Sequence, residues 1–333
     1  MRKFKILLIL VLGLIVTKNT FAQQDISLSM YMFNPLFVNP ATAGYQDKTQ
    51  LNAIGRYQWV GIEGSPKSGN ISIQSPLKNN NMALGALVKY DQIGLMKNVG
   101  LDLSYAYRLK LDEKTRLSLG LMGSLFSLND LRSDGQVNSN GDLTQKNVNA
   151  FLPNFGAGLY LFSKRYFLGV SAPHLLPIKI ANPDLQTAAA VYSKVYNHYF
   201  ASAGYVFGPE IGTKFKPTAF FKLSENSNPN LDINANLLFQ ERFWVGLGYR
   251  FGGDVLDEVA QYQNFKGLRG EAIIGTFKML VNQRLEVGYA YDFPLSNLRR
   301  STSGSHEIFL GYELGKGNST AAKFISPRYV NYF

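Results

Sequence analysis

Few residues in this chain could support catalysis. His174, His198 and His306 are the only histidines among 333 residues, and there is no cysteine. None of the three lies in an H-E-x-x-H segment or beside a G-x-S-x-G turn, the contexts of a zinc hydrolase and a serine nucleophile. His306-Glu307 instead fits a hydrogen-bonding role. A membrane-embedded hydrolase stays an alternative, although it needs a Ser/His/Asp set that these histidines support little. Without cysteine, thiolate metal sites, disulfides and a lipid-modified cysteine are excluded.

One segment could offer oxygen ligands to calcium. Positions 130–149 contain carboxylates and amides in Asp130, Asp134, Asn138, Asn140 and Asp142. Their spacing does not match an EF-hand loop, and no glutamate closes the set. We therefore predict a solvated loop, with calcium binding left open. We predict no catalytic residue, no cofactor and no metal site elsewhere.

A larger set of charged residues shares one side of alternating segments. The set carries both signs, which favours ion pairs across a filled interior over a single-sign ring that would select a solute. A wide open pore, in which water hydrates these charges, is the alternative. The set comprises Arg56, Asp102, Arg108, Asp232, Arg250, Arg269, Glu271, Glu286, Asp292, Glu307 and Glu313.

A repeat of two residues would position these charges. In 101–111 the odd positions are leucine or tyrosine, while the even positions are Asp102, Ser104, Ala106, Arg108 and Lys110. The same alternation returns in 231–240, 243–252, 285–293 and 307–314. Alternation of this kind is typical of β-strands with one apolar and one polar face.

The composition distinguishes a membrane barrel from a soluble sandwich. Aromatic residues make up 13% of the chain, with 19 Tyr, 23 Phe and 31 Gly. The apolar faces often end in Tyr or Phe, as in the aromatic girdles of outer-membrane barrels. The opposite faces combine small residues with sparse charges, which suits a crowded lumen better than bulk water. We predict a transmembrane antiparallel β-barrel.

The alternating segments give about fourteen strands, an even number as a single-chain bacterial barrel requires. The connections that follow every second strand are short, and most of the others are long, as in outer-membrane barrels. The predicted strands are 49–59, 68–77, 82–91, 98–111, 115–127, 153–163, 165–174, 195–208, 214–224, 229–240, 242–252, 267–278, 283–293 and 306–315.

The two ends lie outside this barrel of residues 49–315. Residues 1–22 have a basic start, an apolar run and a small-residue site, which predicts a secretory signal peptide cleaved near Ala22. The apolar run is too short for a membrane-spanning helix. Residues 23–48 are too apolar for a free tail, so we expect them to pack in the lumen or at the short-turn rim. Residues 316–333 are expected to form a periplasmic tail.

The formal net charge of +11 could suggest nucleic acid. An exported chain seldom meets nucleic acid, and the longest basic run noted is Arg299-Arg300. We expect no nucleic-acid partner. A basic surface could instead meet anionic lipid headgroups or an acidic protein.

Several stretches resemble the PorP/SprF family of outer-membrane proteins from the type IX secretion and gliding machinery. The resemblance covers nearly the whole mature chain and is most specific where the first and last motifs combine. The stretches are YMFNPLFVNPA at 31–41, RYQWVGIEGSPK at 56–67, DQIG at 91–94, GYAYDF at 288–293, SGSHEI at 303–308 and SPRY at 326–329.

The resemblance implies a non-enzymatic outer-membrane barrel. Such a protein would assist the export or surface attachment of cargo, gliding adhesins among them, through a C-terminal sorting domain. It would also work with type IX components that include periplasmic ring proteins. Motif positions at the long-loop rim are the expected partner-binding residues, although each could simply fix loop shape: Trp59, Gly61, Pro66, Asp91, Gly94, His306 and Glu307. The alternative function is a porin or transporter for small solutes.

Overall fold

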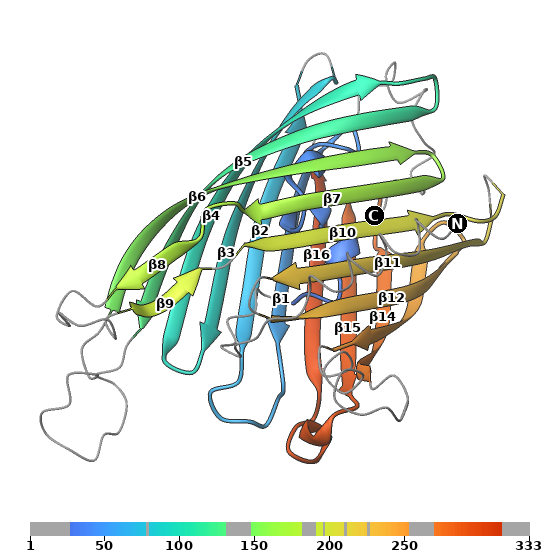
Figure 1. The fold of residues 1–333 in the computed structure, drawn as a ribbon. Helices are drawn as coiled ribbons and strands as arrows, with labels where there is room; N and C mark the ends of the chain where they lie inside the picture. The colour runs from blue at the N-terminus through green and yellow to red at the C-terminus, as the bar shows by residue number, and fades with distance from the viewer. Residues whose placement is uncertain are drawn as a thin grey trace, which may run out of the picture.

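The structure is a computed structural model, and it describes residues 27–77, 80–130, 148–181, 191–195, 197–209, 212–224, 227–252 and 270–314. Fourteen antiparallel strands form a closed barrel in which β1 pairs with β16 (Figure 1). The predicted barrel is confirmed. Within the described ranges, no helix is both long and apolar enough to cross a membrane.

Each wall strand overlaps one predicted segment. The strands are β1 Thr49–Tyr57, β2 Lys67–Pro76, β3 Met82–Ile93, β4 Met96–Lys110, β5 Thr115–Asp130, β6 Val148–Ser163, β7 Tyr166–His174, β10 His198–Tyr205, β11 Lys214–Ser224, β12 Ser227–Phe239, β13 Phe243–Phe251, β14 Gly270–Leu280, β15 Leu285–Pro294 and β16 Ser305–Leu314.

Several strand ends differ from the prediction by a few residues, and three differences matter for the arrangement of the barrel. β1 ends at Tyr57 rather than at position 59, because Trp59 has a left-handed backbone with φ of 51°. The connection between β3 and β4 is only Gly94-Leu95, so it is not one of the long loops. The segment between β7 and β10, expected to be a plain loop, contains a hairpin of β8 Ile178–Ala181 and β9 Val191–Val195.

The residue alternation places apolar side chains on the outside of the barrel. In β4, Leu103 is 58% exposed while its neighbour Asp102 is 1% exposed. In β5, Leu121 is 65% exposed and Ser118 is fully buried. An apolar outer belt with a polar inner face is the reverse of a soluble protein, and it is stable only in contact with lipid.

The wall is unequal in height. β5 and β6 have 16 residues each, whereas β7 and β13 have nine and β10 has eight. At about 3.3 Å per residue, the long strands extend roughly 25 Å further along their axes than the short ones.

Residues 27–48, the plug segment, lie inside the ring of strands (blue in Figure 1). They form three short 3₁₀ turns, η1 Tyr31–Phe33, η2 Pro35–Phe37 and η3 Pro40–Thr42. Proline begins two of these turns, and the Asn39 side chain accepts a hydrogen bond from the Ala41 amide. A proline fixes φ and lacks a backbone donor, so these repeated prolines favour short turns over a continuous helix or strand.

Candidate functional site

The plug segment occupies the bore and contacts wall strands on all sides. Tyr31 stacks on Phe220 of β11 with ring centroids 4.3 Å apart and accepts a hydrogen bond from Asn234 of β12. The Asn34 side chain bonds Asn70 and Ser72 of β2. Further contacts reach β3–β7 on one half of the wall and β13–β16 on the other. Most of the segment is buried, and Met30 and Ala41 have no solvent exposure.

Two paired glycines make room for the middle of the plug segment. Gly120 of β5 and Gly158 of β6 are register partners on the inner face. A Cβ atom at Gly120 would lie 2.1 Å from the Ala41 nitrogen, and one at Gly158 would lie 2.1 Å from Asn39 Oδ1. Only glycine lets the wall approach the segment this closely.

The barrel has a loop side, where the long-loop rim lies, and a turn side, where the short-turn rim lies. A buried charge cluster holds the end of the plug segment on the loop side. Arg250 donates two hydrogen bonds of 2.9 Å to Asp232 and one of 3.0 Å to Asp292. Arg56 donates to Asp292 at 2.7 Å and to Glu307 at 3.0 Å. These side chains are at most 4% exposed. All five charges belong to the set predicted from the sequence to face the interior, and the structure brings them into one cluster.

Ser29 completes this cluster from the plug segment. Its hydroxyl donates to Asp292 and accepts from Arg56 and Arg250, while its amide donates to Glu307 at 2.8 Å. The cluster has two guanidinium groups for three carboxylates, so backbone and hydroxyl donors supply what a third cation would. Such pairing is what makes buried charge tolerable in a dry interior.

Arg108 holds the turn-side end of the segment. Its guanidinium pairs with Asp47 and donates to the carbonyl oxygens of Ala43 and Gly44. Arg116 lies 3.7 Å from Asp47. Burial raises the pKa of Asp47 above its ordinary value, and the two guanidinium groups offset part of that shift. The plug segment is therefore held at one end of the bore by hydrogen bonds from Ser29 and Met30 to a buried charge cluster, and at the other end by the Asp47–Arg108 ion pair.

The other predicted lumen charges have separate partners. Asp102 pairs with Lys89 at 2.7 Å, Glu286 with Lys278 at 3.0 Å and Glu313 with Lys48 at 2.8 Å. Glu271 accepts a hydrogen bond of 3.0 Å from Asn230. Arg269 lies outside the described residues. Asp102, Glu286 and Glu313 thus form three separate ion pairs rather than one continuous ladder.

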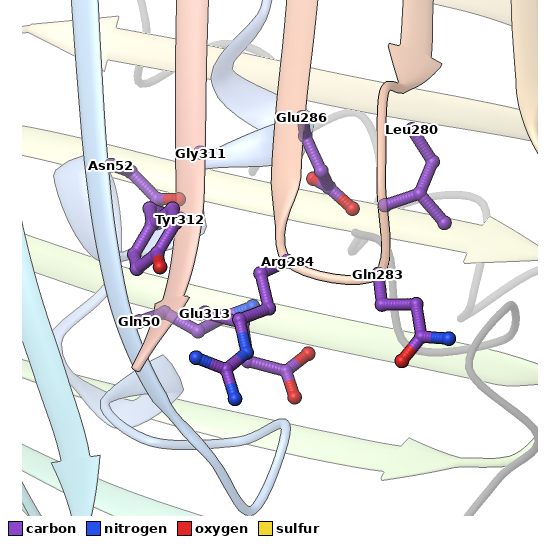
Figure 2. Close-up of a pocket in the computed structure, with 9 residues that line it drawn as sticks. All are labelled: Gln50, Asn52, Leu280, Gln283, Arg284, Glu286, Gly311, Tyr312 and Glu313. Atoms are coloured by element: carbon purple, nitrogen blue, oxygen red, sulfur yellow. The ribbon is translucent and has the colours of Figure 1, made fainter. Parts of the chain in front are cut away.

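A small hollow opens at the turn-side rim, between β1, β16 and the β14–β15 turn (Figure 2). Arg284 and Gln283 come from the β14–β15 turn, and Gln50 and Glu313 come from β1 and β16. The residues that line it carry amides and charges of both signs, without a serine or histidine nucleophile–base pair. This arrangement offers polar contacts but no group placed for covalent chemistry.

Three connections on the opposite rim are joined into one surface, here called the loop platform (residues 58–66, 94–95 and 295–304). The Val60 amide donates to Gly304 O at 2.8 Å, and the Ser303 amide donates to Val60 O at 2.8 Å. The Gly94 amide donates to Gly64 O at 2.9 Å. The platform is therefore a braced surface formed by loops distant in sequence.

The seven predicted partner-binding residues are distributed over this platform and the wall below it. Gly61 and Gly94 are exposed, whereas Trp59, Pro66, Asp91 and His306 are half-buried. Several of them brace the loops: the Trp59 amide donates to Ser305 Oγ, Pro66 O accepts from Gln58, and Asp91 accepts from Ser68. Glu307 is fully buried in the bore, so the structure places it in the charge cluster and away from the rim surface.

Gly304 is critical for the platform. Its φ is 89°, and a Cβ atom there would lie 2.7 Å from the backbone oxygen of Asp292. We expect Gly304→Ala to separate 295–304 from 58–66 and to speed tryptic cleavage at the exposed Arg299-Arg300 about tenfold, as strain of a few kcal/mol allows. Gly55→Ala is the control, because nothing lies within 4 Å of that position. Equal cleavage rates in the two variants would contradict the bracing role.

The structure also identifies residues that sequence analysis did not single out. Ser29 and Asp47 are the polar anchors of the plug segment, and Lys89 and Lys278 are counter-charges. The sequence did not identify Ser29 and Asp47 as anchors, because the plug segment lacks strand periodicity and residue spacing cannot assign its wall partners. The inward glycine Gly120 was detectable as a small residue on a polar face.

The histidines form no three-ligand site. His174 and His198 are register neighbours on β7 and β10, with ring centroids 5.6 Å apart. His306 Nδ1 lies 2.6 Å from the Tyr289 hydroxyl. Within the described ranges, no group of three or more His, Cys, Asp or Glu residues could hold a metal ion. Residues 131–147, the centre of the loop that we predicted to be solvated and for which calcium binding was left open, lie outside those ranges.

Comparison with solved structures relates the fold to outer-membrane barrels. CymD, a monoaromatic hydrocarbon channel, shares 12% identity over 86% of this chain and 94% of its own, with a TM-score of 0.51. A Pseudomonas aeruginosa FadL homologue shares 12% over 85% and 94%, with a TM-score of 0.46. The Acinetobacter baumannii protein Omp33 shares 10% over 80% and 98%, with a TM-score of 0.43. At these identities the likeness concerns the fold alone.

Sequence comparison gives the family. No curated protein matches the chain significantly. The family model described as type IX secretion system membrane protein PorP/SprF matches residues 20–312, which include the plug segment and nearly the whole wall. The plugged bore and the loop platform are thus features of a membrane protein with a secretion-related role, and the chain belongs to the PorP/SprF family of type IX secretion system membrane proteins.

Proposed function

We propose that this protein is a non-enzymatic, permanently plugged outer-membrane barrel that assists the export or surface attachment of cargo through a C-terminal sorting domain. The loop platform would contact the exported partner, and the turn-side rim would face the periplasmic components of the secretion system. Family membership supports the secretion setting, and the cargo and its sorting domain are the proposed part.

The observation that carries this proposal is the filled bore. The plug segment has polar anchors at both ends, Ser29 and Asp47, and packs against paired glycines between them. A solute porin needs a continuous aqueous path, whereas a docking barrel needs only a stable wall and an outer surface. The anchored segment therefore favours docking over solute transport.

Conductance separates these two functions. In planar bilayers, we expect the purified full-length protein to show no steady open channel, because the plug segment occupies the bore. The porin alternative predicts stepwise ionic currents from the same preparation. Steady currents from the intact chain would reject the plugged-barrel proposal.

Export of cargo tests the role itself. Cells that lack this gene should retain sorting-domain proteins, and a plasmid copy should restore their appearance at the surface. We expect Trp59→Ala to weaken co-purification of such cargo about tenfold or more, because aromatic residues commonly dominate interfaces. Tyr166→Ala, at the short-turn end of β7, is the control. Unchanged export in the deletion strain would reject the role, whereas unchanged capture by Trp59→Ala would reject only this docking surface.

A further inference from the structure

The closing seam of the barrel lies between β1 and β16. Thr49 pairs with Leu314 at one end of this seam and Tyr57 pairs with His306 at the other. No turn of the chain crosses it, and its residues are far apart in sequence: Arg56 and Glu307 are separated by 251 positions. Closure between such distant segments carries a larger entropic cost than closure of a hairpin.

Buried charges lie at the loop-side end of the seam. Arg56 and Glu307 are register partners across it, and their side chains are 3.0 Å apart on the inner face. Arg56 also reaches Asp292 of the next strand at 2.7 Å. Arg250 of β13 also reaches Asp292, at 3.0 Å, but Glu307, which pairs with Arg56, needs further donors in this dry position.

Two adjacent residues of the plug segment supply these donors. The amides of Ser29 and Met30 donate to the two oxygens of Glu307 at 2.8 and 2.7 Å. The Ser29 hydroxyl donates to Asp292 at 2.7 Å and accepts from Arg56 at 3.1 Å. One dipeptide therefore contacts side chains of β1, β15 and β16 at once.

We propose that Ser29 and Met30 form an intramolecular strap that holds the closing seam, beyond their part in blocking the bore. Ser29 is only 27 positions from Arg56 but 278 from Glu307. The strap is thus tethered to the first strand and binds the last two, which raises the effective concentration of one seam partner near the other. This inference is independent of the role in secretion.

Hydrogen exchange along the folded, full-length chain in detergent tests the strap. Ser29→Ala combined with Met30→Pro removes the hydroxyl and one amide donor without altering a wall strand. Exchange should accelerate about tenfold or more in β1 and β16, as the loss of hydrogen bonds to charged groups implies, and stay unchanged in β4 and β5. Ser27→Ala is the matched control, because Ser27 contacts Lys222 of β11 and not the seam. Unchanged exchange at the seam, or equal acceleration in β4 and β5, would overturn the proposal.

If the double variant does not fold, an engineered disulfide across the seam still tests the proposal. Ala53 and Leu310 are register partners across the seam, and the chain has no cysteine of its own. A disulfide between Ala53→Cys and Leu310→Cys should restore the compact, heat-modifiable form to the strap variant. Failure of the oxidised pair to restore it, while the same pair folds in the otherwise unmodified chain, would show that Ser29 and Met30 act elsewhere.

Discussion

Replacing Gly120 with valine is expected to displace the plug segment and give the barrel an open, conducting bore. The Cβ atom alone would meet three atoms of the segment backbone, at 2.1, 2.4 and 2.5 Å. Backbone cannot rotate away as a flexible side chain can, so the segment must move as a whole. We expect a loss of about 3 kcal/mol or more in stability. Planar-bilayer recordings should show steady currents that the unaltered protein lacks.

Gly123 provides the matched control for this substitution. It belongs to the same strand, points outward and has nothing within 4 Å of its Cβ position. Gly123→Val should therefore remain closed and retain its heat-modifiable mobility in gels. If Gly120→Val also stayed closed with unchanged stability, the close fit between the wall and Ala41 would not be what keeps the bore filled.

Replacing Arg250 with methionine should be among the most destabilising single changes in the barrel. Arg250 is the main partner of Asp232 and the second cation on Asp292. Its loss leaves a carboxylate uncompensated in a dry interior, which typically costs about 3–5 kcal/mol. The expected result is a marked fall in the temperature at which the folded band is lost in unboiled gels.

Two further variants serve as comparisons for this prediction. Adding Asp232→Leu to Arg250→Met removes the pair as a unit and should recover part of the loss, because no buried charge is then stranded there. Lys48→Met breaks an ion pair whose side chains are 23% and 17% exposed, so it should cost less than about 1 kcal/mol. Equal effects from Arg250→Met and Lys48→Met would contradict the central place of the buried cluster.

The wall was predictable from sequence because its signal is local. The alternation in 101–111 fixes which side chains face lipid. The structure agrees, because Leu103 is exposed on the outer face and Asp102 is buried on the inner face. A one-residue slip would reverse every side chain, so the period alone determines the faces of a strand. For the same reason, the inward charges Arg56 and Asp292 could be named without coordinates.

The interior could not be predicted to the same depth because its contacts are not local. Asn39 of the plug segment lies directly against Gly158 of the wall, and no periodicity links a turn to the strand that it contacts. The partners of Asp102 and Glu286 were missed because Lys89 and Lys278 reach them from neighbouring strands, and register cannot be read from one strand alone. Glu307 was expected both among the inward charges and as a partner-binding residue at the rim, and the inward face of β16 places it in the bore.

The unequal height of the wall affects how the barrel sits in a bilayer. A level placement that matches the short strands β7 and β10 would leave the far end of β6 in water, including Phe151, which is 74% exposed. Hydrophobic mismatch of this kind is relieved by inclination or by local thickening of the lipid. The barrel axis should therefore tilt so that the far ends of β5 and β6 enter the hydrocarbon region. The lipid around the barrel should then be deformed by different amounts beside the long and the short strands.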